Sequence, residues 1–280
     1  MRYTDRLQEA ISHAGSTLCV GLDPVPERIP EEIRTANPTP EKQVEAFCLE
    51  IIDITAPYCA AFKPNLAFFE ALGARGLDVF HRIRKAIPSN KLVIADAKRG
   101  DIGSTAQMYR RALMDQFGSD AVTLNPLMGF DTLEPWMDLP DRAIYALVLT
   151  SNPGSRDLLL RRLESGQTVA AYLAQRLHEY SKANQTHLGM VVGATHNEVM
   201  RPVLEAAPNA SLLIPGIGTQ GGDLEPLMAL LARHKGLPLI NSSRSILYAG
   251  ENVEHPWRDA VEARAQTIRD ALRPLTSRYV

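Results

Sequence analysis

The run of residues 92–103, LVIADAKRGDIG, constrains this chain more than any other stretch. Its four apolar residues predict a buried strand, and the charged residues Asp96, Lys98 and Asp101 follow at once. Side chains two positions apart in a strand point the same way, so Asp96 and Lys98 should emerge side by side at the strand's carboxyl end. Charges that leave water need partners. The run therefore indicates either a functional site or a structural ion pair with helix-capping acids.

Short apolar runs alternate with segments of helical spacing along the chain. Continuous apolar runs are typical of parallel strands that are covered on both faces. Eight strands alternating with helices over 280 residues predict the α/β class, as a single (β/α)8 TIM barrel domain over residues 1–280 rather than an open doubly wound sheet. The predicted strands are 17–21, 60–63, 92–96, 121–124, 144–150, 189–193, 212–214 and 237–241, and the predicted helices are 43–54, 76–86, 104–117, 168–182, 197–206 and 224–233.

Three predicted long loops, residues 23–40, 151–167 and 216–223, each follow the carboxyl end of a strand. Barrel enzymes build their sites at this end. Loops longer than about 12 residues tend to be functional, although a long surface insertion is also tolerated. The roles of the proline-rich first loop and of Arg156, Arg161 and Arg162 in the second stay open.

Composition excludes several classes of function. A net charge of −2 leaves no basic footprint for nucleic acid or an anionic membrane. No apolar run approaches the roughly 20 residues of a membrane span, and the first residues lack the apolar core of a signal peptide. Cys19, Cys48 and Cys59 form no CxxC motif and fit inert thiols in a reducing cytoplasm. We therefore expect a cytoplasmic protein with no nucleic-acid or membrane partner.

A glycine-rich turn follows the seventh predicted strand. Residues 215–222, PGIGTQGG, offer backbone N–H groups that can close on an anion. The turn contains GxGxxG, but it lies outside the first βαβ unit and lacks the following acid that NAD sites use. Arg244, after the eighth strand, is suited to bind phosphate oxygens. The sequence predicts a phosphate site between these loops; the alternative is a tight turn beside a surface arginine.

Polar residues end other predicted strands as well. Lys63 ends the second strand, Asp23 follows the first and Ser151 follows the fifth. Each also has an ordinary interpretation, as a solvated head on a buried stem or as a turn residue. The seven histidines form no HExxH motif or clustered ligand pattern. Chemistry without a metal is therefore the default expectation.

Together these residues resemble orotidine 5′-phosphate decarboxylase, and its longer bacterial, type 2 branch most. The resemblance runs from residues 21–24, GLDP, to residues 243–246, SRSI. The DxKxxD motif at 96–101 is by itself shared with phosphosugar relatives. Joined to the PGxGxQGG motif at 215–222 and to Arg244, it is specific for this family.

The resemblance implies a homodimeric barrel without cofactor or metal that makes uridine 5′-phosphate and CO₂ from orotidine 5′-phosphate, the last step of de novo pyrimidine biosynthesis. The implied catalytic residues are Lys63, Asp96, Lys98 and Asp101, with Lys98 protonating a carbanion at C6 of the pyrimidine. Asp101 and Thr105, four apart on one helix face, would reach into the partner subunit's site. The implied substrate-binding residues are Asp23 and Lys63 at the ribose, Ser151 at the pyrimidine amide, Gln220 and Arg244 at the phosphate, with Pro215 and Gly218 beside them.

Two alternatives stay open. A phosphosugar decarboxylase or an aldolase-type relative on the same barrel, such as a ketogulonate-phosphate decarboxylase or hexulose-phosphate synthase, would use Mg²⁺. The Pro64 and Asn65 that follow Lys63, in place of an acid, argue against it. A catalytically silent barrel that binds a phosphorylated ligand is the other alternative, but it would have no need of Lys98 and its two flanking aspartates.

Overall fold

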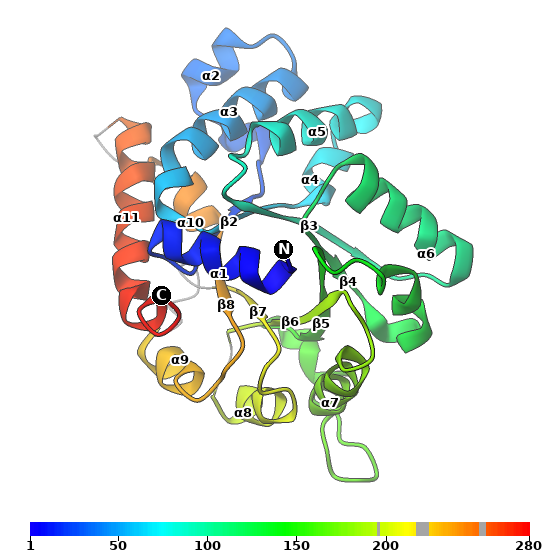
Figure 1. Cartoon of the computed structure of the whole chain (residues 1–280). Coiled ribbons are helices and arrows are strands. Elements are labelled where there is room, and N and C mark those ends of the chain that lie inside the picture. Colours follow the sequence, from blue (N-terminus) through cyan, green and yellow to red (C-terminus); the bar gives the residue numbers. More distant parts are fainter. Residues whose placement is uncertain (195–196, 217–223, 252–255) are drawn as a thin grey trace.

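The computed structural model describes residues 1–194, 197–216, 224–251 and 256–280. Within them eight parallel strands close into a barrel, with β8 pairing with β1, and helices surround the strands (Figure 1). The predicted (β/α)8 barrel is therefore confirmed. The strands are β1 Leu18–Leu22, β2 Ala61–Pro64, β3 Leu92–Arg99, β4 Ala121–Leu124, β5 Ala143–Leu149, β6 His187–Val192, β7 Leu212–Pro215 and β8 Pro238–Ser242.

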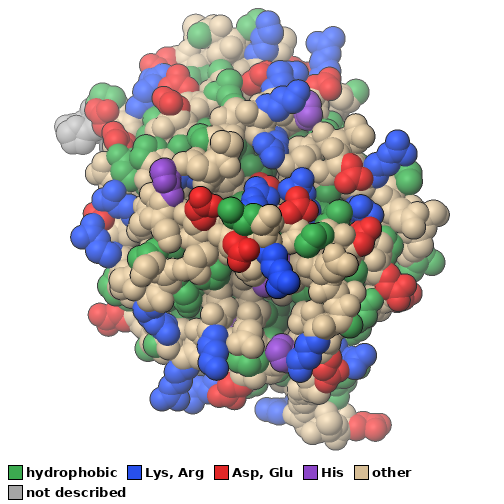
Figure 2. Space-filling view, in the orientation of Figure 1, with side chains coloured by type: hydrophobic (Ala, Val, Ile, Leu, Met, Phe, Trp, Pro, Cys, Tyr) green, Lys and Arg blue, Asp and Glu red, His purple; other side chains and the backbone are tan. Residues whose placement is uncertain are grey.

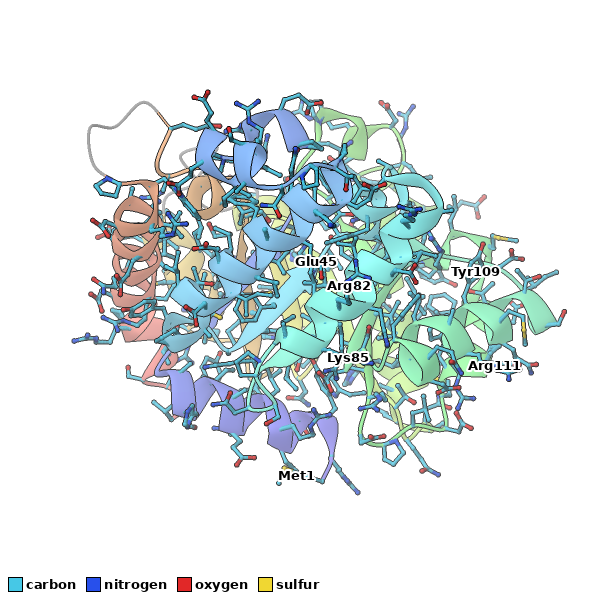
Figure 3. The ribbon with its side chains drawn as sticks, turned by 90° about the horizontal axis from the view of Figure 1, so that it is seen from above. Met1, Glu45, Arg82, Lys85, Tyr109 and Arg111 are labelled. Atoms are coloured by element: carbon cyan, nitrogen blue, oxygen red, sulfur yellow. The ribbon has the colours of Figure 1, made fainter. Side chains whose placement is uncertain are left out.

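Helices follow the strands on the outside, except that a short 3₁₀ helix, Phe130–Trp136, takes the place of an α-helix after β4. On one side Arg82 Nε of α5 lies 2.6 Å from Glu45 Oε1 of α3 and ties these two neighbouring helices together (Figure 3). The α-helices are α1 Tyr3–Ala14, α2 Glu31–Ala36, α3 Pro40–Thr55, α4 Leu66–Glu70, α5 Gly76–Ala86, α6 Gly103–Arg110, α7 Val169–Ser181, α8 Asn197–Ala206, α9 Leu224–Leu231, α10 Arg244–Leu247 and α11 Trp257–Thr276.

Alternate residues of each strand pack on opposite sides of the barrel wall, although both sides are buried. In β3, Val93 and Ala95 belong to the apolar layer between strands and helices. Leu92 and Ile94 belong instead to the cluster that fills the barrel. The next position of this inner row is Asp96. The alternation that fills the barrel with apolar side chains at one end thus carries a carboxylate into it at the other.

Helix α1 closes the amino-terminal end of the barrel. The hydroxyls of Tyr3 and Tyr145 lie 3.1 Å apart, and the Arg6 guanidinium donates to buried Asp120 at 2.6 Å. Figure 2 shows positive and negative side chains interspersed over this face, so it carries no charge field of one sign. Figure 3 places Met1 and α1 at one end of the molecule and α2 at the opposite end, so α2 lies at the carboxyl end of the strands.

The predicted loop 23–40 is wrong in part, because it contains the short helix Pro26–Arg28 and helix α2. Pro26 lies in the first turn and Pro30 caps α2, and a proline's missing N–H group costs little at these positions. The predicted helix 104–117 is two segments: α6 ends at Arg110, and a π-helical segment, Arg111–Gln116, follows. Most other predicted boundaries differ by one to three residues, within the usual fraying of element ends.

The expectation of inert cysteines is confirmed. Cys19, Cys48 and Cys59 are free and buried. Burial raises the pKa of each thiol well above its ordinary value, so the reactive thiolate is suppressed at neutral pH. Among the described helices, none combines the length and the apolar character needed to cross a membrane.

The aromatic cluster between α4, α5 and the end of the π-helical segment should carry a large share of stability. The Phe80 ring meets those of Phe69 and Phe117 edge-on at 5.5 and 5.2 Å between ring centres. We expect Phe80→Ala to lower the free energy of unfolding by about 3–5 kcal/mol, because it leaves a cavity in a packed layer. Leu77→Ala on the same helix is the control: Leu77 is 39% exposed, and its loss should cost less than about 1 kcal/mol. Urea denaturation of both variants measures this, and equal losses would contradict it.

Candidate active site

Most of the predicted site residues lie at the carboxyl ends of different strands. This end of a parallel barrel is where loops from every strand meet. Lys63 ends β2, Asp96 and Lys98 lie in β3, and Pro215 ends β7. Asp23, Ser151 and Arg244 come directly, or within two residues, after β1, β5 and β8.

Asp96 lies between two lysines. Its Oδ2 accepts a hydrogen bond from Lys63 Nζ at 2.6 Å, and its Oδ1 accepts one from Lys98 Nζ at 2.5 Å. Lys63 and Asp96 are 4% and 7% exposed, whereas the Lys98 side chain is 49% exposed. Burial by itself raises the pKa of Asp96, but attraction to Lys63 and Lys98 outweighs it and holds that pKa well below its usual range. The carboxylate is therefore ionised and both of its oxygens are occupied.

Lys98 owes its position to an irregularity in β3. Ala95 pairs with Val122 and Arg99 pairs with Leu124, so three residues of β3 stand opposite one residue of β4. Lys98 has φ +48°, and among the described residues it is the one non-glycine residue with positive φ. Such strain costs about 1–3 kcal/mol and concentrates at functional sites. The bulge directs the Lys98 ammonium onto Asp96 while leaving it open to the mouth of the barrel.

Gly100 follows this bulge for a steric reason. A Cβ atom on Gly100 would lie 2.5 Å from the carbonyl oxygen of Asn125, which follows β4. The Asn125 N–H donates to the Arg99 carbonyl at 2.7 Å, so the two chain segments are held in contact. Glycine is required here for close approach of the backbones, and its φ lies outside the left-handed region.

Two buried side-chain oxygens at the mouth of the barrel have no hydrogen-bond partner among the described residues. They are Oδ1 of Asp23 and Oδ1 of Asn241, and both are buried. Burial lowers the pKa of Lys63, but the charges of Asp96 and Asp23 outweigh it and raise that pKa, so Asp23 also acts on this cluster. Asn241 was not predicted as a site residue. The sequence pattern could have identified it, because Asn241 lies two positions after Leu239 in β8 and so belongs to the same inner row of the strand.

Ser151 lies against the ends of β6 and β7. A Cβ atom on Gly193 would lie 2.6 Å from the Ser151 nitrogen, and one on Gly216 would lie 3.7 Å from its Oγ. Gly216 has φ +101°, which favours glycine. The structure thus brings Ser151 next to the start of the glycine-rich turn. The predicted residues Gly218 and Gln220 lie outside the described residues.

Arg244 begins α10 and is exposed. Among the described residues, no hydrogen bond or ion pair joins it to the Lys63–Asp96–Lys98 cluster. It stands on the far side of β1 from Lys63, because β1 lies between β8 and β2 in the barrel. A ligand that touched both Arg244 and Lys98 would therefore extend across the mouth of the barrel.

The expectation that Asp101 and Thr105 share one helix face is wrong. Helix α6 begins at Gly103 with Ile102 as its cap, so Asp101 precedes the helix while Thr105 lies in its first turn. Gly103 has φ +49°, a left-handed conformation that turns the chain at the first residue of the helix. The Asp101 carboxylate accepts a hydrogen bond from the Ile102 N–H at 2.9 Å, and the described contacts do not join it to Lys98.

No group of three or more His, Cys, Asp or Glu side chains in the described part of the chain is placed to hold a metal ion. A hollow of about 600 Å³ lies at the opposite end of the barrel beside Tyr3, Pro140 and His187. This hollow contains none of the predicted site residues. The candidate active site is therefore the cluster around Asp96 at the mouth of the barrel.

The Asp96 ion pairs should contribute stability that depends on pH. The pKa of Asp96 is lowered on folding, so its contribution is present above the ordinary aspartate pKa of about 3.9 and is lost as the pH falls toward the lower folded value. We expect Asp96→Asn to reduce the free energy of unfolding by about 3–5 kcal/mol at pH 7, because Lys63 then stays buried without its counter-ion. The difference from the wild type should narrow below about pH 4.

Urea denaturation of both proteins between pH 3 and pH 8 measures this difference. Asp101→Asn is the control, and it should cost less than about 1 kcal/mol, because Asp101 makes no ion pair among the described residues. A difference that stays constant down to pH 3 would contradict the assignment of the low pKa to Asp96.

Comparison with known proteins agrees with this geometry. Residues 16–258 match the family described as "Orotidine 5'-phosphate decarboxylase / HUMPS family". The chain is 42% identical to "Orotidine 5'-phosphate decarboxylase" of Roseiflexus sp. (strain RS-1), over 92% of each chain, and 39% identical to the protein of that name from Dehalococcoides mccartyi, over the full length of both. Among solved structures, the OMP decarboxylase of Leishmania donovani is 33% identical and covers 96% of this chain and 99% of its own, with a TM-score of 0.78. This chain therefore belongs to the orotidine 5′-phosphate decarboxylase / HUMPS family.

Proposed function

We propose that this protein decarboxylates orotidine 5′-phosphate to uridine 5′-phosphate and CO₂, the last step of de novo pyrimidine biosynthesis, without metal or cofactor. The names of its relatives over nearly their whole length support this activity. The observation that carries the proposal is the single carboxylate held between two lysines at the mouth of the barrel. We also propose that the enzyme works in the cytoplasm, which its free, buried cysteines support.

The substrate would lie across the mouth, with each of its parts meeting a different loop. Arg244 and the turn that contains Pro215, Gly218 and Gln220 would hold the phosphate. Ser151 would bond the pyrimidine amide. Asp23 and Lys63 would hold the ribose hydroxyls, and the unpartnered Oδ1 of Asp23 supports this role, because a buried acceptor without a donor favours a ligand that brings one.

The reaction breaks the bond between C6 and its carboxyl carbon. CO₂ leaves, and the electron pair of that bond stays on C6 of the pyrimidine, where the ring offers it little delocalisation. The Lys98 ammonium stabilises this carbanion through a preorganised charge and then donates a proton to C6. Lys98 regains its proton from water after the product is formed.

Asp96 would raise the energy of the bound substrate, because its fixed carboxylate faces the substrate's carboxylate. This repulsion disappears as the substrate's carboxylate becomes neutral CO₂. Lys63 keeps Asp96 ionised and in place, as its 2.6 Å contact and burial support. Binding of the remote phosphate would supply the energy that holds the two carboxylates together.

We propose that the enzyme is a homodimer in which Asp101 and Thr105 of one subunit complete the site of the other. Four apolar side chains near Asp101 are more than half exposed, and a second copy of the chain would cover them. They are Ile102 (54%), Met108 (55%), Leu127 (68%) and Met128 (56%). Asp101 and Ala106 line the same small hollow as Asn125, the residue that precedes the segment 126–128. Exposed apolar residues that gather in one region of a surface mark protein interfaces.

Loss of Lys98 should abolish turnover while leaving the fold intact. The decrease in ultraviolet absorbance of orotidine 5′-phosphate, measured in EDTA, reports decarboxylation. We expect rapid loss of absorbance with the wild type and a rate at least about 1,000-fold lower with Lys98→Ala, since both charge stabilisation and proton donation are removed. Lys85→Ala, an exposed lysine on α5, is the matched control and should keep the wild-type rate (Figure 3).

Three outcomes would contradict parts of this proposal. No turnover by the wild type would exclude the pyrimidine substrate, and phosphosugars with Mg²⁺ would be tested next. Turnover that EDTA abolishes would exclude metal-free chemistry. Near-normal turnover by Lys98→Ala would exclude Lys98 as the proton donor.

The shared site predicts complementation between two inactive subunits. We expect Asp101→Ala and Lys98→Ala homodimers to be inactive. A mixed dimer, isolated with two different affinity tags, should recover about half of the wild-type activity, because one of its two symmetric sites then has both residues. A mixed dimer of two differently tagged Lys98→Ala chains is the control. An inactive Asp101→Ala and Lys98→Ala dimer would show that Asp101 does not act across the interface.

A further inference from the structure

We infer that Thr123 is a positioning residue, whose hydroxyl holds Asp96 and the backbone of Lys98 in the arrangement that the reaction needs. This inference rests on the proposed function and extends it to a residue outside the charged cluster. Thr123 lies in β4 and is 2% exposed. It follows Ala121 in the inner row of that strand, so its side chain reaches the barrel's mouth from the wall beside β3.

The Thr123 hydroxyl bridges the two charged residues of β3. Its Oγ1 donates a hydrogen bond to Asp96 Oδ1 at 2.9 Å and accepts one from the Lys98 backbone N–H at 3.0 Å. A hydroxyl has one hydrogen to donate, and here the N–H of Lys98 fixes the direction in which it points. With the bond from Lys98 Nζ to Asp96 Oδ1, the contacts form a closed ring.

The bulge in β3 explains why this ring needs a side chain from β4. Between the pairs Ala95–Val122 and Arg99–Leu124, Thr123 is the single residue of β4 that stands opposite three residues of β3. The bulge disrupts the regular ladder there. The Thr123 side chain supplies the acceptor that satisfies the Lys98 N–H and stabilises the left-handed backbone of Lys98.

These contacts fix the rotation of the Asp96 carboxylate as well as its ionised state. Lys63 binds only Oδ2, and the exposed Lys98 side chain binds only Oδ1. Thr123 is the buried group that fixes Oδ1 independently of the exposed Lys98 side chain. Without it, the carboxylate can rotate about its bond to Lys63, and the Lys98 backbone loses its anchor. A displacement of about 1 Å at a reacting group costs on the order of 100-fold in rate.

The test compares two variants of Thr123: one lacks the hydroxyl of the wild-type side chain, and the other lacks its methyl group. Thr123→Val keeps the branched shape and removes the hydroxyl, whereas Thr123→Ser keeps the hydroxyl. We expect Thr123→Val to lower kcat for orotidine 5′-phosphate by about 10- to 100-fold with KM within about 3-fold, and Thr123→Ser to keep kcat within about 3-fold. Thr55→Val is the control, because Thr55 is equally buried but its hydroxyl donates to the Ile51 carbonyl in α3, and it should keep the wild-type kcat.

Equal losses in the valine and serine variants would overturn the inference, because the serine variant keeps the hydroxyl and the loss of kcat would then not follow it. An unchanged kcat in Thr123→Val would overturn it as well. A wild type without turnover would instead contradict the proposed function. A second measurement that needs no substrate then decides on Thr123.

That measurement is hydrogen exchange of the Lys98 backbone amide, followed by NMR. In the wild type and Thr123→Ser the amide should exchange at least about 10-fold more slowly than in Thr123→Val, because the hydroxyl accepts its hydrogen bond. Equal exchange in all three proteins would overturn the inference. If Thr123→Val does not fold, an unprotected Lys98 amide in the wild type would do the same.

Discussion

The site depends on one interaction, the ionised Asp96 held between Lys63 and Lys98. A carboxylate at 7% exposure would be strongly disfavoured without partners, and here each of its oxygens meets an ammonium group. The two lysines differ in their surroundings: Lys63 is buried and needs Asp96 as its counter-ion, whereas Lys98 is half exposed and presents its charge to the mouth. The cluster therefore keeps a negative charge inside the barrel's mouth and a positive charge at its surface, in fixed relation to each other.

The barrel makes this cluster possible through the alternation of its strands. The inner rows begin with apolar side chains such as Leu92, Ile94 and Ala121, which pack against one another. The same rows end in Asp96 and Thr123, because side chains two positions apart share a side of the wall. The amino-terminal end is closed by α1, whose Tyr3 and Arg6 bind residues of the barrel's end. The carboxyl-terminal end is left for polar groups that a substrate can use.

The strained backbone around Lys98 in β3 is stabilised by contacts from the neighbouring strand β4. The left-handed Lys98 and the bulge around it are unfavourable for the isolated strand, and they persist because the neighbouring strand supplies matching contacts. Thr123 binds the Lys98 N–H, and the Asn125 N–H binds the carbonyl of Arg99, so the irregular segment is anchored at both ends. The segment that carries the reacting lysine is thus defined by β4 as much as by its own sequence.

The sequence by itself determined the fold class and the residues that surround the mouth, because apolar runs, helical spacing and polar residues at strand ends are all local patterns. It predicted Asp96 and Lys98 together for the same reason. It did not identify Thr123 or Asn241, and it misplaced Asp101 on a helix face, because these depend on a bulge and on a left-handed turn at Gly103. Only closure of the barrel decided which residues meet: Lys63 and Asp96 are 33 positions apart, and register between strands, rather than spacing along the chain, brings them into contact.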